Sequence, residues 1–254
     1  MKMKQLASVI MAAGKGTRMK DPTKAKVMYE VLGKPMIHYV LDVAFALHSH
    51  RVVVITGYQR EAVMSYIKQS HPSAELVVQA EQLGTGHAMM QTRDALKNYE
   101  GDIVVLSGDV PLLTVQSMQQ LIDHQRTTNA SATILTAEYS DPTGYGRIVR
   151  NIDGSVKKIV EQKDATDAER QIREINSGIY VFDREKLFEG LSNINSNNAQ
   201  KEYYLTDVFE YFWKHQWKVA ALKAEHPEEI QGVNTLEQLA EVQSVLLQRQ
   251  DAST

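Results

Sequence analysis

A short stretch near the start of the chain combines a strand-like apolar run with groups that can hold phosphate. The apolar residues 9–13 (VIMAA) lead into a loop that carries Gly14, Lys15, Gly16 and Arg18. The two glycines allow a sharp turn and let the backbone approach a ligand closely. Loop N–H groups and a guanidinium are fixed donors for an anion, so these residue types at this spacing predict a phosphate site.

The spacing of the glycines separates this loop from two better-known phosphate-binding loops. The sequence has no GxxxxGK[ST] pattern, which excludes a P-loop. Met19 stands where GxGxxG would need its third glycine, so the dinucleotide-binding fingerprint also fails. A bare GxG by itself favours an ordinary strand-to-loop turn, and the phosphate site therefore needs support from other residues.

A second candidate group follows a buried-looking apolar segment, in the order Ser107-Gly108-Asp109. An aspartate at the end of a strand, beside a phosphate site, is a suitable Mg²⁺ ligand because hard cations prefer carboxylate oxygen. The alternative is that Asp109 caps the helix that follows it.

Eight segments, in order along the chain, resemble the sugar-phosphate nucleotidyltransferases. They are AAGKGTRM, LGTGHA, SGDVPL, DPTGYGRI, IVEQKDAT, EINSGIYVFD, NNAQKEYYLTD and GVNTLEQL. Within that family they are most similar to the uridylyltransferase domain of bacterial N-acetylglucosamine-1-phosphate uridylyltransferases, over about Ser8 to Val242. The resemblance implies that a sugar 1-phosphate attacks the α-phosphorus of UTP, which releases pyrophosphate and forms a UDP-sugar.

This reaction needs cations more than it needs a base. A phosphate monoester, with a second pKa of about 6, is already an anionic nucleophile at neutral pH. Catalysis then depends on neutralising crowded negative charge and on positioning. The resemblance assigns these tasks to Arg18, at the β- and γ-phosphates, and to Lys26. Because Ala25 replaces the proline of the family motif and the preceding loop looks one residue longer, Lys24 competes with Lys26 for this role.

The resemblance also implies a Mg²⁺ cofactor with two protein ligands, Asp109 and Asn234. An amide oxygen is a plausible second ligand because Mg²⁺ commonly keeps waters and phosphate oxygens as its other ligands. Taken alone, Asn234 reads as the N-cap of the last helix. Ser107 departs from the tyrosine that many family members have at this position, which affects the wall on the sugar side.

The two substrates are assigned to separate groups of residues. The nucleotide-binding positions implied by the resemblance are Ala12, Ala13, Gly14, Gln79, Gly84 and Thr85. A side-chain amide such as that of Gln79 can both donate and accept, as the edge of uracil requires. The sugar-phosphate-binding positions implied in the same way are Gly146, Glu161 and Asn176, of which the glycine would let the sugar approach the backbone.

Strand-like and helix-like segments alternate in the first half of the chain. Runs rich in β-branched residues lie at 51–56, 74–79 and 102–107, and apolar residues at helical spacing lie at 36–47, 60–69 and 84–96. This alternation predicts an α/β fold with a Rossmann-like, mixed but mostly parallel sheet flanked by helices. Ligands in such sheets collect at the carboxyl ends of the strands, where the glycine loop and Asp109 both fall.

After residue 128 the pattern changes. Strands are predicted at 130–138, 146–150, 156–160 and 218–222, and helices at 183–191, 204–215 and 236–250. The turn NIDG at 151–154 predicts a hairpin between two of these strands.

We expect a single nucleotidyltransferase domain over residues 1–254. About 1–128 would form a nucleotide-binding half, about 129–234 a sugar-phosphate-binding half on the same sheet, and 235–254 a C-terminal helix and tail. The left-handed β-helix domain that follows in two-domain family members is absent from this sequence, so we expect a naturally short enzyme or an excised domain.

Composition narrows the class of partner. The chain has 254 residues, 43% of them hydrophobic and 23% charged, with a net charge of -3. This balance gives no electrostatic reason to expect nucleic acid or a membrane as a partner. The absence of cysteine and of any signal or transmembrane segment favours a cytoplasmic protein. Family trimers are held largely by the β-helix, so we expect a monomer or a weak dimer.

Three alternatives stay open. The same reaction could use glucose 1-phosphate as acceptor, or dTTP in place of UTP, because acceptor choice depends on a few contacts. A glycosyltransferase shares this kind of architecture, although its usual Asp-x-Asp motif is not present at SGDVP. A non-catalytic sensor of nucleotide sugars would bind the substrates without turnover.

Overall fold

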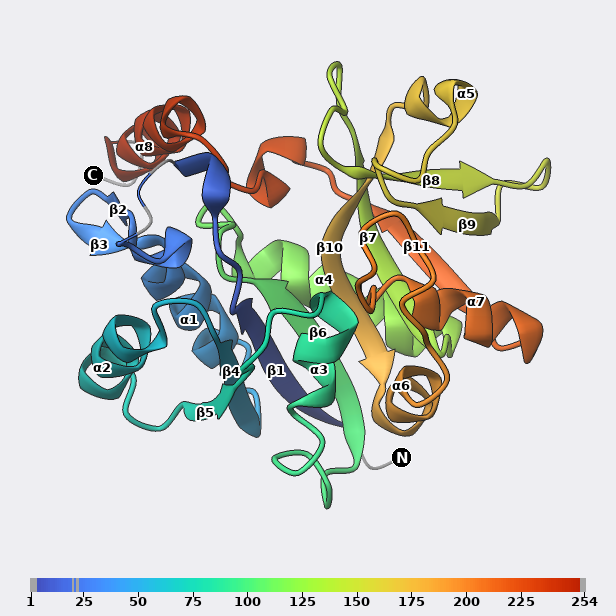
Figure 1. The fold of residues 1–254 in the computed structure, drawn as a ribbon, viewed down its shortest axis with the longest axis horizontal. Coiled ribbons are helices and arrows are strands. Elements are labelled where there is room, and N and C mark those ends of the chain that lie inside the picture. The colour runs from blue at the N-terminus through green and yellow to red at the C-terminus, as the bar shows by residue number, and fades with distance from the viewer. Residues whose placement is uncertain (1–3, 20, 22, 252–254) are drawn as a thin grey trace.

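One nine-stranded mixed sheet forms the centre of the protein (Figure 1). The structure is a computed structural model and describes residues 4–19, 21 and 23–251. The strands along the main path of the sheet are in the order β11-β7-β10-β6-β1-β4-β5. Strand β8 pairs with β10, and β9 pairs with β8. The strands of this sheet are β1 Gln5–Ala12, β4 Arg51–Thr56, β5 Glu75–Val78, β6 Gly101–Ser107, β7 Ala132–Glu138, β8 Gly146–Arg150, β9 Val156–Val160, β10 Glu174–Asp183 and β11 Val219–Lys223.

Most strands of the sheet run in the same direction, as the sequence predicts. Strand β1 pairs in parallel with both β4 and β6, β4 with β5, and β11 with β7. The long strand β10 is antiparallel to β6, β7 and β8, and β8 and β9 form the predicted hairpin. Strands from both halves of the chain therefore belong to one sheet, and the mixed, mostly parallel α/β architecture is confirmed.

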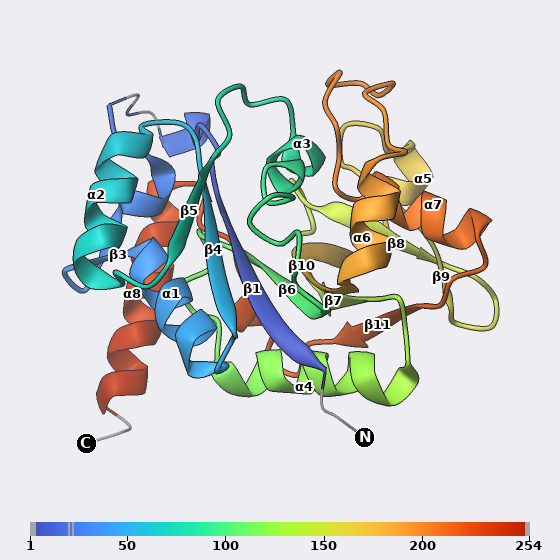
Figure 2. The same ribbon diagram turned by 90° about the horizontal axis from the view of Figure 1, so that it is seen from below.

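Helices cover both faces of the sheet (Figure 2). Alternating side chains of β1 divide the core, because Ile10 packs with helices α1, α2 and α4, whereas Val9 packs with α3, α6 and α7 on the opposite face. These helices are α1 Met36–Ala46, α2 Arg60–Ser70, α3 Thr85–Met90, α4 Val115–Thr128, α6 Arg184–Leu191 and α7 Asp207–Lys214. Within the described residues no helix is both long and apolar enough to span a membrane.

The remaining elements lie at the edges of this core. A two-stranded sheet joins β2 Glu30–Val31 to β3 Lys34–Pro35, and α8 Leu236–Asp251 packs Val242 against Val31 and Met36. Short helices complete the chain at Thr17–Met19, Lys26–Met28, α5 Asp167–Arg170 and Pro227–Ile230.

Two elements differ from the sequence expectation. Helix α3 ends at Met90 instead of continuing to residue 96, and the Thr92 hydroxyl donates to the Met89 carbonyl in the turns that follow (2.8 Å). Strand β10 is not predicted from apolar pattern because polar residues interrupt it. At that point Gly178 has φ +79° and the register with β7 shifts between Asn176 and Tyr180.

Candidate active site

The glycine loop follows β1, which lies between β4 and β6 in the middle of the sheet. The carbonyl of Met11 accepts from Gly108 N (3.0 Å), which holds the loop beside the end of β6. Gly16 has φ +59°, and an added Cβ would lie 2.5 Å from the Cβ of Lys26. Any other residue would be strained at this position, and the glycine lets the Lys26 side chain pack against the loop.

A cavity of about 450 Å³ opens at this carboxyl edge of the sheet. Its size lies in the range typical of small-ligand sites. The predicted residues that line it are Ala12, Ala13, Gly14, Lys26, Gln79, Gly84, Thr85 and Asp109. Other lining residues are Met11, Lys15, Gly16, Val27, Gln82, Ala88, Ser107 and Glu202.

Four of the predicted residues meet in one charged cluster beside this cavity. Lys26 Nζ donates to Asp109 Oδ2 and to Asn234 Oδ1, the latter at 3.0 Å. Arg18 Nη2 donates to the same Asn234 oxygen at 2.8 Å. Residues that are up to 216 positions apart in sequence are thus brought to one point.

The ionisation of Asp109 is set by these neighbours. Its burial by itself would raise the pKa of the carboxyl group. The Lys26 ammonium and the Ser107 hydroxyl, which donates to Asp109 Oδ1 at 2.6 Å, outweigh burial and hold this pKa below its ordinary value. Asp109 is therefore an anion at neutral pH and a suitable oxygen donor for a hard cation.

The structure shows whether Asp109 and Asn234 act as helix caps, which is the alternative to a role as metal ligands. Helix α4 is capped by Thr114, whose side chain accepts from Ser117 N at 3.2 Å, so Asp109 is not its cap. At the start of α8 it is Thr235 Oγ1 that accepts from Gln238 N, at 3.2 Å. Both side chains assigned to the metal, Asp109 and Asn234, face the charged cluster instead.

The structure also distinguishes Lys24 from Lys26 as the lysine of the family motif. The Lys24 ammonium lies 5.0 Å from the centroid of the Tyr29 ring. Lys26, in contrast, lines the cavity and contacts Asp109. The extra loop residue and Ala25 therefore leave Lys26 as the lysine that reaches the cluster.

The Gln79 amide, which the resemblance assigns to the uracil base, is held in place by a backbone carbonyl. Gln79 Nε2 donates to the Gly84 carbonyl (3.0 Å) and lies 3.1 Å from His87 Nδ1. Gly84 has φ +108°, and an added Cβ would lie 2.5 Å from the Tyr203 carbonyl. This turn therefore requires glycine.

The three residues assigned to the sugar also lie together. A Cβ added to Gly146 would lie 3.4 Å from both the Asn176 Cβ and a carboxylate oxygen of Glu161. Asn176 Nδ2 donates to the Tyr180 hydroxyl (2.7 Å), and Glu161 accepts from Thr206 Oγ1 (3.0 Å). Burial raises the pKa of Glu161, and the Thr206 hydrogen bond opposes this effect.

The segment 202–206 connects the three residues assigned to the sugar with the cavity. Glu202 lines the cavity, Leu205 N donates to Thr85 Oγ1 (3.0 Å), and Thr206 holds Glu161. Glu202 and Thr206 belong to the matched segment NNAQKEYYLTD, but no residue pattern in the sequence marks Glu202 or Gln82 as lining the cavity.

The cluster suits a divalent hard cation. Asp109 Oδ2 and Asn234 Oδ1 both accept a hydrogen bond from the Lys26 ammonium, so the two oxygens face the same cation. A carboxylate and an amide oxygen directed at one cation form a donor set that Mg²⁺ accepts.

Comparison with known proteins places the chain in a family. The family model described as nucleotidyl transferase matches residues 7–227. The protein named Bifunctional protein GlmU from Pelotomaculum thermopropionicum is 46% identical over 96% of this chain, and the one from Halalkalibacterium halodurans is 47% identical over 95%. Each alignment covers 52% of the relative, so the chain spans about half the length of the curated relatives it matches.

A solved structure has the same fold at low sequence identity. A UDP-glucose pyrophosphorylase complexed with UDP-glucose superposes with a TM-score of 0.77, at 19% identity, over 96% of this chain and 99% of that one. The family match extends over most of the residues that build the cavity and the sheet beneath it. This chain belongs to the nucleotidyl transferase family.

Proposed function

We propose that this nucleotidyltransferase transfers the uridylyl group of UTP to N-acetylglucosamine 1-phosphate, forming UDP-N-acetylglucosamine and pyrophosphate. The observation that carries the proposal is the cluster of Arg18, Lys26, Asp109 and Asn234 at the edge of a nucleotide-sized cavity. Relatives at 46–47% identity that carry the GlmU name support the choice of reaction.

The chemical step is an in-line displacement at the α-phosphorus. An oxygen of the sugar phosphate forms the new P–O bond, while the bond between the α-phosphorus and the oxygen bridging to the β-phosphorus breaks. Pyrophosphate leaves with that electron pair. No general base is required, because the attacking phosphate is already anionic near neutral pH.

Cations of this chain would stabilise the charge that moves in this step. Lys26 approaches both Asp109 and the glycine loop, so its ammonium can neutralise phosphate oxygens near the reacting centre. Arg18 ends the glycine loop and can stabilise the leaving pyrophosphate by paired hydrogen bonds. Loop N–H groups add further donors.

We infer a Mg²⁺ cofactor held by Asp109 and Asn234. When bound, the ion would neutralise phosphate charge and help to orient the triphosphate. Lys26 and Arg18 already contact these two side chains, so they keep the oxygen donors directed at the cavity edge.

Substrate selection would come from the two polar groups. The amide of Gln79, fixed by Gly84, would pair with the edge of uracil, and Ala12 and Ala13 would leave room for the ring. On the acceptor side, Glu161 and Asn176 would bind hydroxyl and N-acetyl groups above Gly146.

Pyrophosphate release from UTP tests this function. The purified chain would be assayed with Mg²⁺ and N-acetylglucosamine 1-phosphate, glucosamine 1-phosphate or glucose 1-phosphate, and with dTTP replacing UTP. We expect the highest kcat/KM with UTP and the first sugar. A higher value for another pair would overturn the substrate assignment but leave the reaction, and sugar transfer without pyrophosphate release would indicate a glycosyltransferase. Binding of UTP without turnover would favour a sensor.

A further inference from the structure

A second cluster of metal-binding side chains lies apart from the nucleotide cavity, where α1 meets α2. His38 and Asp42 are one helical turn apart on α1, and His71 directly follows α2. Figure 1 shows these two helices side by side at the β5 edge of the sheet. One ligand atom from each of the three side chains lies within 4.8 Å of the other two.

Both imidazoles direct the same ring nitrogen at one carboxylate. His71 Nε2 lies 3.0 Å from Asp42 Oδ1, and His38 Nε2 lies 3.4 Å from Asp42 Oδ2. Metal–ligand bonds of about 2.0–2.1 Å place the ligand atoms of a tetrahedral zinc site about 3.3 Å apart. The two observed separations, one to each oxygen of the Asp42 carboxylate, are close to this length.

The other nitrogen of each ring is held by a hydroxyl group. Tyr66 OH lies 2.9 Å from His38 Nδ1, and Ser70 Oγ lies 3.0 Å from His71 Nδ1. A hydroxyl oxygen can accept from Nδ1–H, which leaves the Nε2 lone pair available for a metal. The Tyr66 hydroxyl can also donate to His38 Nδ1, whereas the Ser70 hydroxyl donates to the Tyr66 carbonyl (3.0 Å) and can accept from His71 Nδ1–H.

Both imidazoles are mostly enclosed by the protein. The His38 side chain is 15% exposed. The His71 ring is 12% exposed and stacks on Phe45 with ring centroids 5.3 Å apart. The 55% exposed Asp42 leaves the cluster open to solvent, from which an ion can enter and a water can complete its coordination.

We propose that His38, Asp42 and His71 form a binding site for a divalent transition metal of the zinc class, which clamps α1 to α2. Two imidazole nitrogens and one carboxylate oxygen select zinc-like ions over Mg²⁺. The site is separate in donor chemistry from the oxygen-only pair Asp109 and Asn234.

Cobalt(II) titration of the full chain tests this site. Excess Mg²⁺ would occupy the oxygen ligands at Asp109, and the visible absorption of Co²⁺ would report the coordination of the added ion. We expect one Co²⁺ per chain with the intense bands of a tetrahedral site, displaced by Zn²⁺. At 100 times the Kd of Zn²⁺, we also expect a rise in Tm on the order of 5–10 °C.

Variants locate the ion. His71→Asn should weaken Co²⁺ binding by more than about 10-fold and abolish the tetrahedral bands, and the more exposed Asp42→Asn should do the same without disturbing the helix contact. Tyr66→Phe, which removes only the hydroxyl on His38 Nδ1, should weaken binding by about 10–100-fold. His48→Asn is the matched control. It lies just after the same helix, its φ of +52° suits asparagine, and it should bind Co²⁺ like the parent.

Two results would overturn the proposal. One is weak octahedral absorption alone, as expected from oxygen ligands. The other is an unchanged tetrahedral spectrum in both His71→Asn and Asp42→Asn. In either case the three side chains serve only as a hydrogen-bonded contact between the helices.

Discussion

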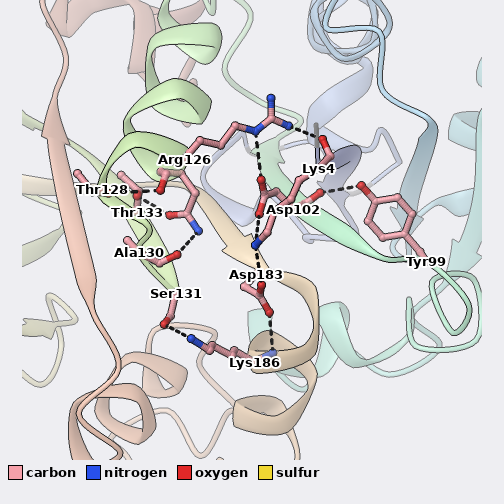
Figure 3. Close-up of polar contacts among 11 residues, drawn as sticks. Lys4, Tyr99, Asp102, Arg126, Thr128, Ala130, Ser131, Thr133, Asp183 and Lys186 are labelled. Carbon is pink, nitrogen blue, oxygen red and sulfur yellow. Dashed lines mark hydrogen bonds and ion pairs between the residues drawn. The ribbon is translucent and has the colours of Figure 1, made fainter. Parts of the chain in front are cut away.

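Two aspartates at opposite ends of strand β6 differ in what surrounds them. Asp102, near the amino end, is 1% exposed and lies 3.5 Å from the Lys4 ammonium and 3.3 Å from Arg126 Nε (Figure 3). The Lys4 ammonium also contacts Asp183 at 3.0 Å. Two cations and two carboxylates balance one another in this network.

Asp109, beyond the carboxyl end, shares its cation with an uncharged amide. Lys26 contacts both Asp109 and Asn234, and Arg18 reaches only the amide oxygen of that pair. The cluster therefore carries more positive than negative charge, and it borders a cavity. The same strand thus ends in a balanced ionic network on one side and, on the other, in a cluster with excess positive charge that suits an anion. The surroundings distinguish these two roles, since the residue type is the same.

Of the effects that this comparison predicts, the largest is the loss of catalytic activity when Asp109 is replaced. Asp109→Asn keeps the shape and the hydrogen bond from Ser107 but removes the charge that a metal requires. We expect kcat/KM for pyrophosphate release to fall about 10³-fold. Stopped assays over a range of Mg²⁺ concentrations would measure it, and full activity at ordinary Mg²⁺ would contradict the metal assignment.

A somewhat smaller loss is expected from the cation of the same cluster. Lys26→Met should lower kcat about 10²–10³-fold, because in the proposed mechanism this charge stabilises the transferring phosphates. Lys24→Met is the matched control. It loses a cation–π contact with Tyr29 and an electrostatic interaction with Asp21, both outside the charged cluster, and should stay within about twofold of the parent. The reverse ranking of the two variants would reassign the motif lysine.

These two lysines also show where sequence reasoning ends. The motif identifies a lysine after the glycine loop, but an extra residue and Ala25 leave two candidates. The structure separates them, because Lys26 contacts Asp109 whereas Lys24 lies over the Tyr29 ring. The parallel core strands are readable because long apolar runs have few alternatives. Strand β10 is not, since its Asn176 and Ser177 are polar for reasons of site and bulge geometry.

The contacts that join the two halves of the chain could not be predicted from the sequence, for a different reason. Leu205 N donating to Thr85, and Thr206 donating to Glu161, depend on how two distant segments meet across the sheet. No local pattern encodes such a meeting. Residues that face the cavity from these segments, such as Glu202, look like ordinary surface charges in the sequence.

At the other end of β6 the prediction concerns stability. Asp102→Asn leaves Lys4 and Arg126 without their buried anion. Because their side chains are 51% and 30% exposed, both cations can regain water, and the loss should stay below the roughly 3–5 kcal/mol of a fully buried pair. We expect about 2 kcal/mol less free energy of unfolding in urea titrations, with kcat unchanged. A fall in kcat at unchanged stability would erase the distinction between the two ends.

The sugar side of the site gives a smaller and more selective effect. Gly146→Ala adds a methyl group at ordinary contact distance from Asn176 and Glu161, so the chain should fold normally while the space for the sugar shrinks. We expect KM for the sugar phosphate to rise about 10-fold, with UTP affinity unchanged by calorimetry. Equal losses for both substrates would mean that Gly146 shapes the whole cavity instead of the acceptor pocket.

The smallest effect expected is on the pH dependence of stability, through Asp207, a buried carboxyl group near other carboxylates. Burial, followed by the charges of Glu210, Glu161 and Asp164, raises the pKa of Asp207 from 3.8 to about 6. The folded state therefore holds this proton more tightly than the unfolded chain. The resulting stability is fully present below about pH 4 and is lost as the pH rises through 6.

Asp207→Asn should remove this loss, because the amide stays neutral at every pH. We expect its Tm to exceed that of the parent by about 1–3 °C at pH 7–8 and to match it near pH 4. Asp167→Asn, at the first position of α5, is the control for the helix-terminal charge, and it should lower Tm slightly at neutral pH. If Asp207→Asn also lowered Tm at pH 7–8, the site end would be balanced at this carboxylate too, as Asp102 is at the other end of the sheet.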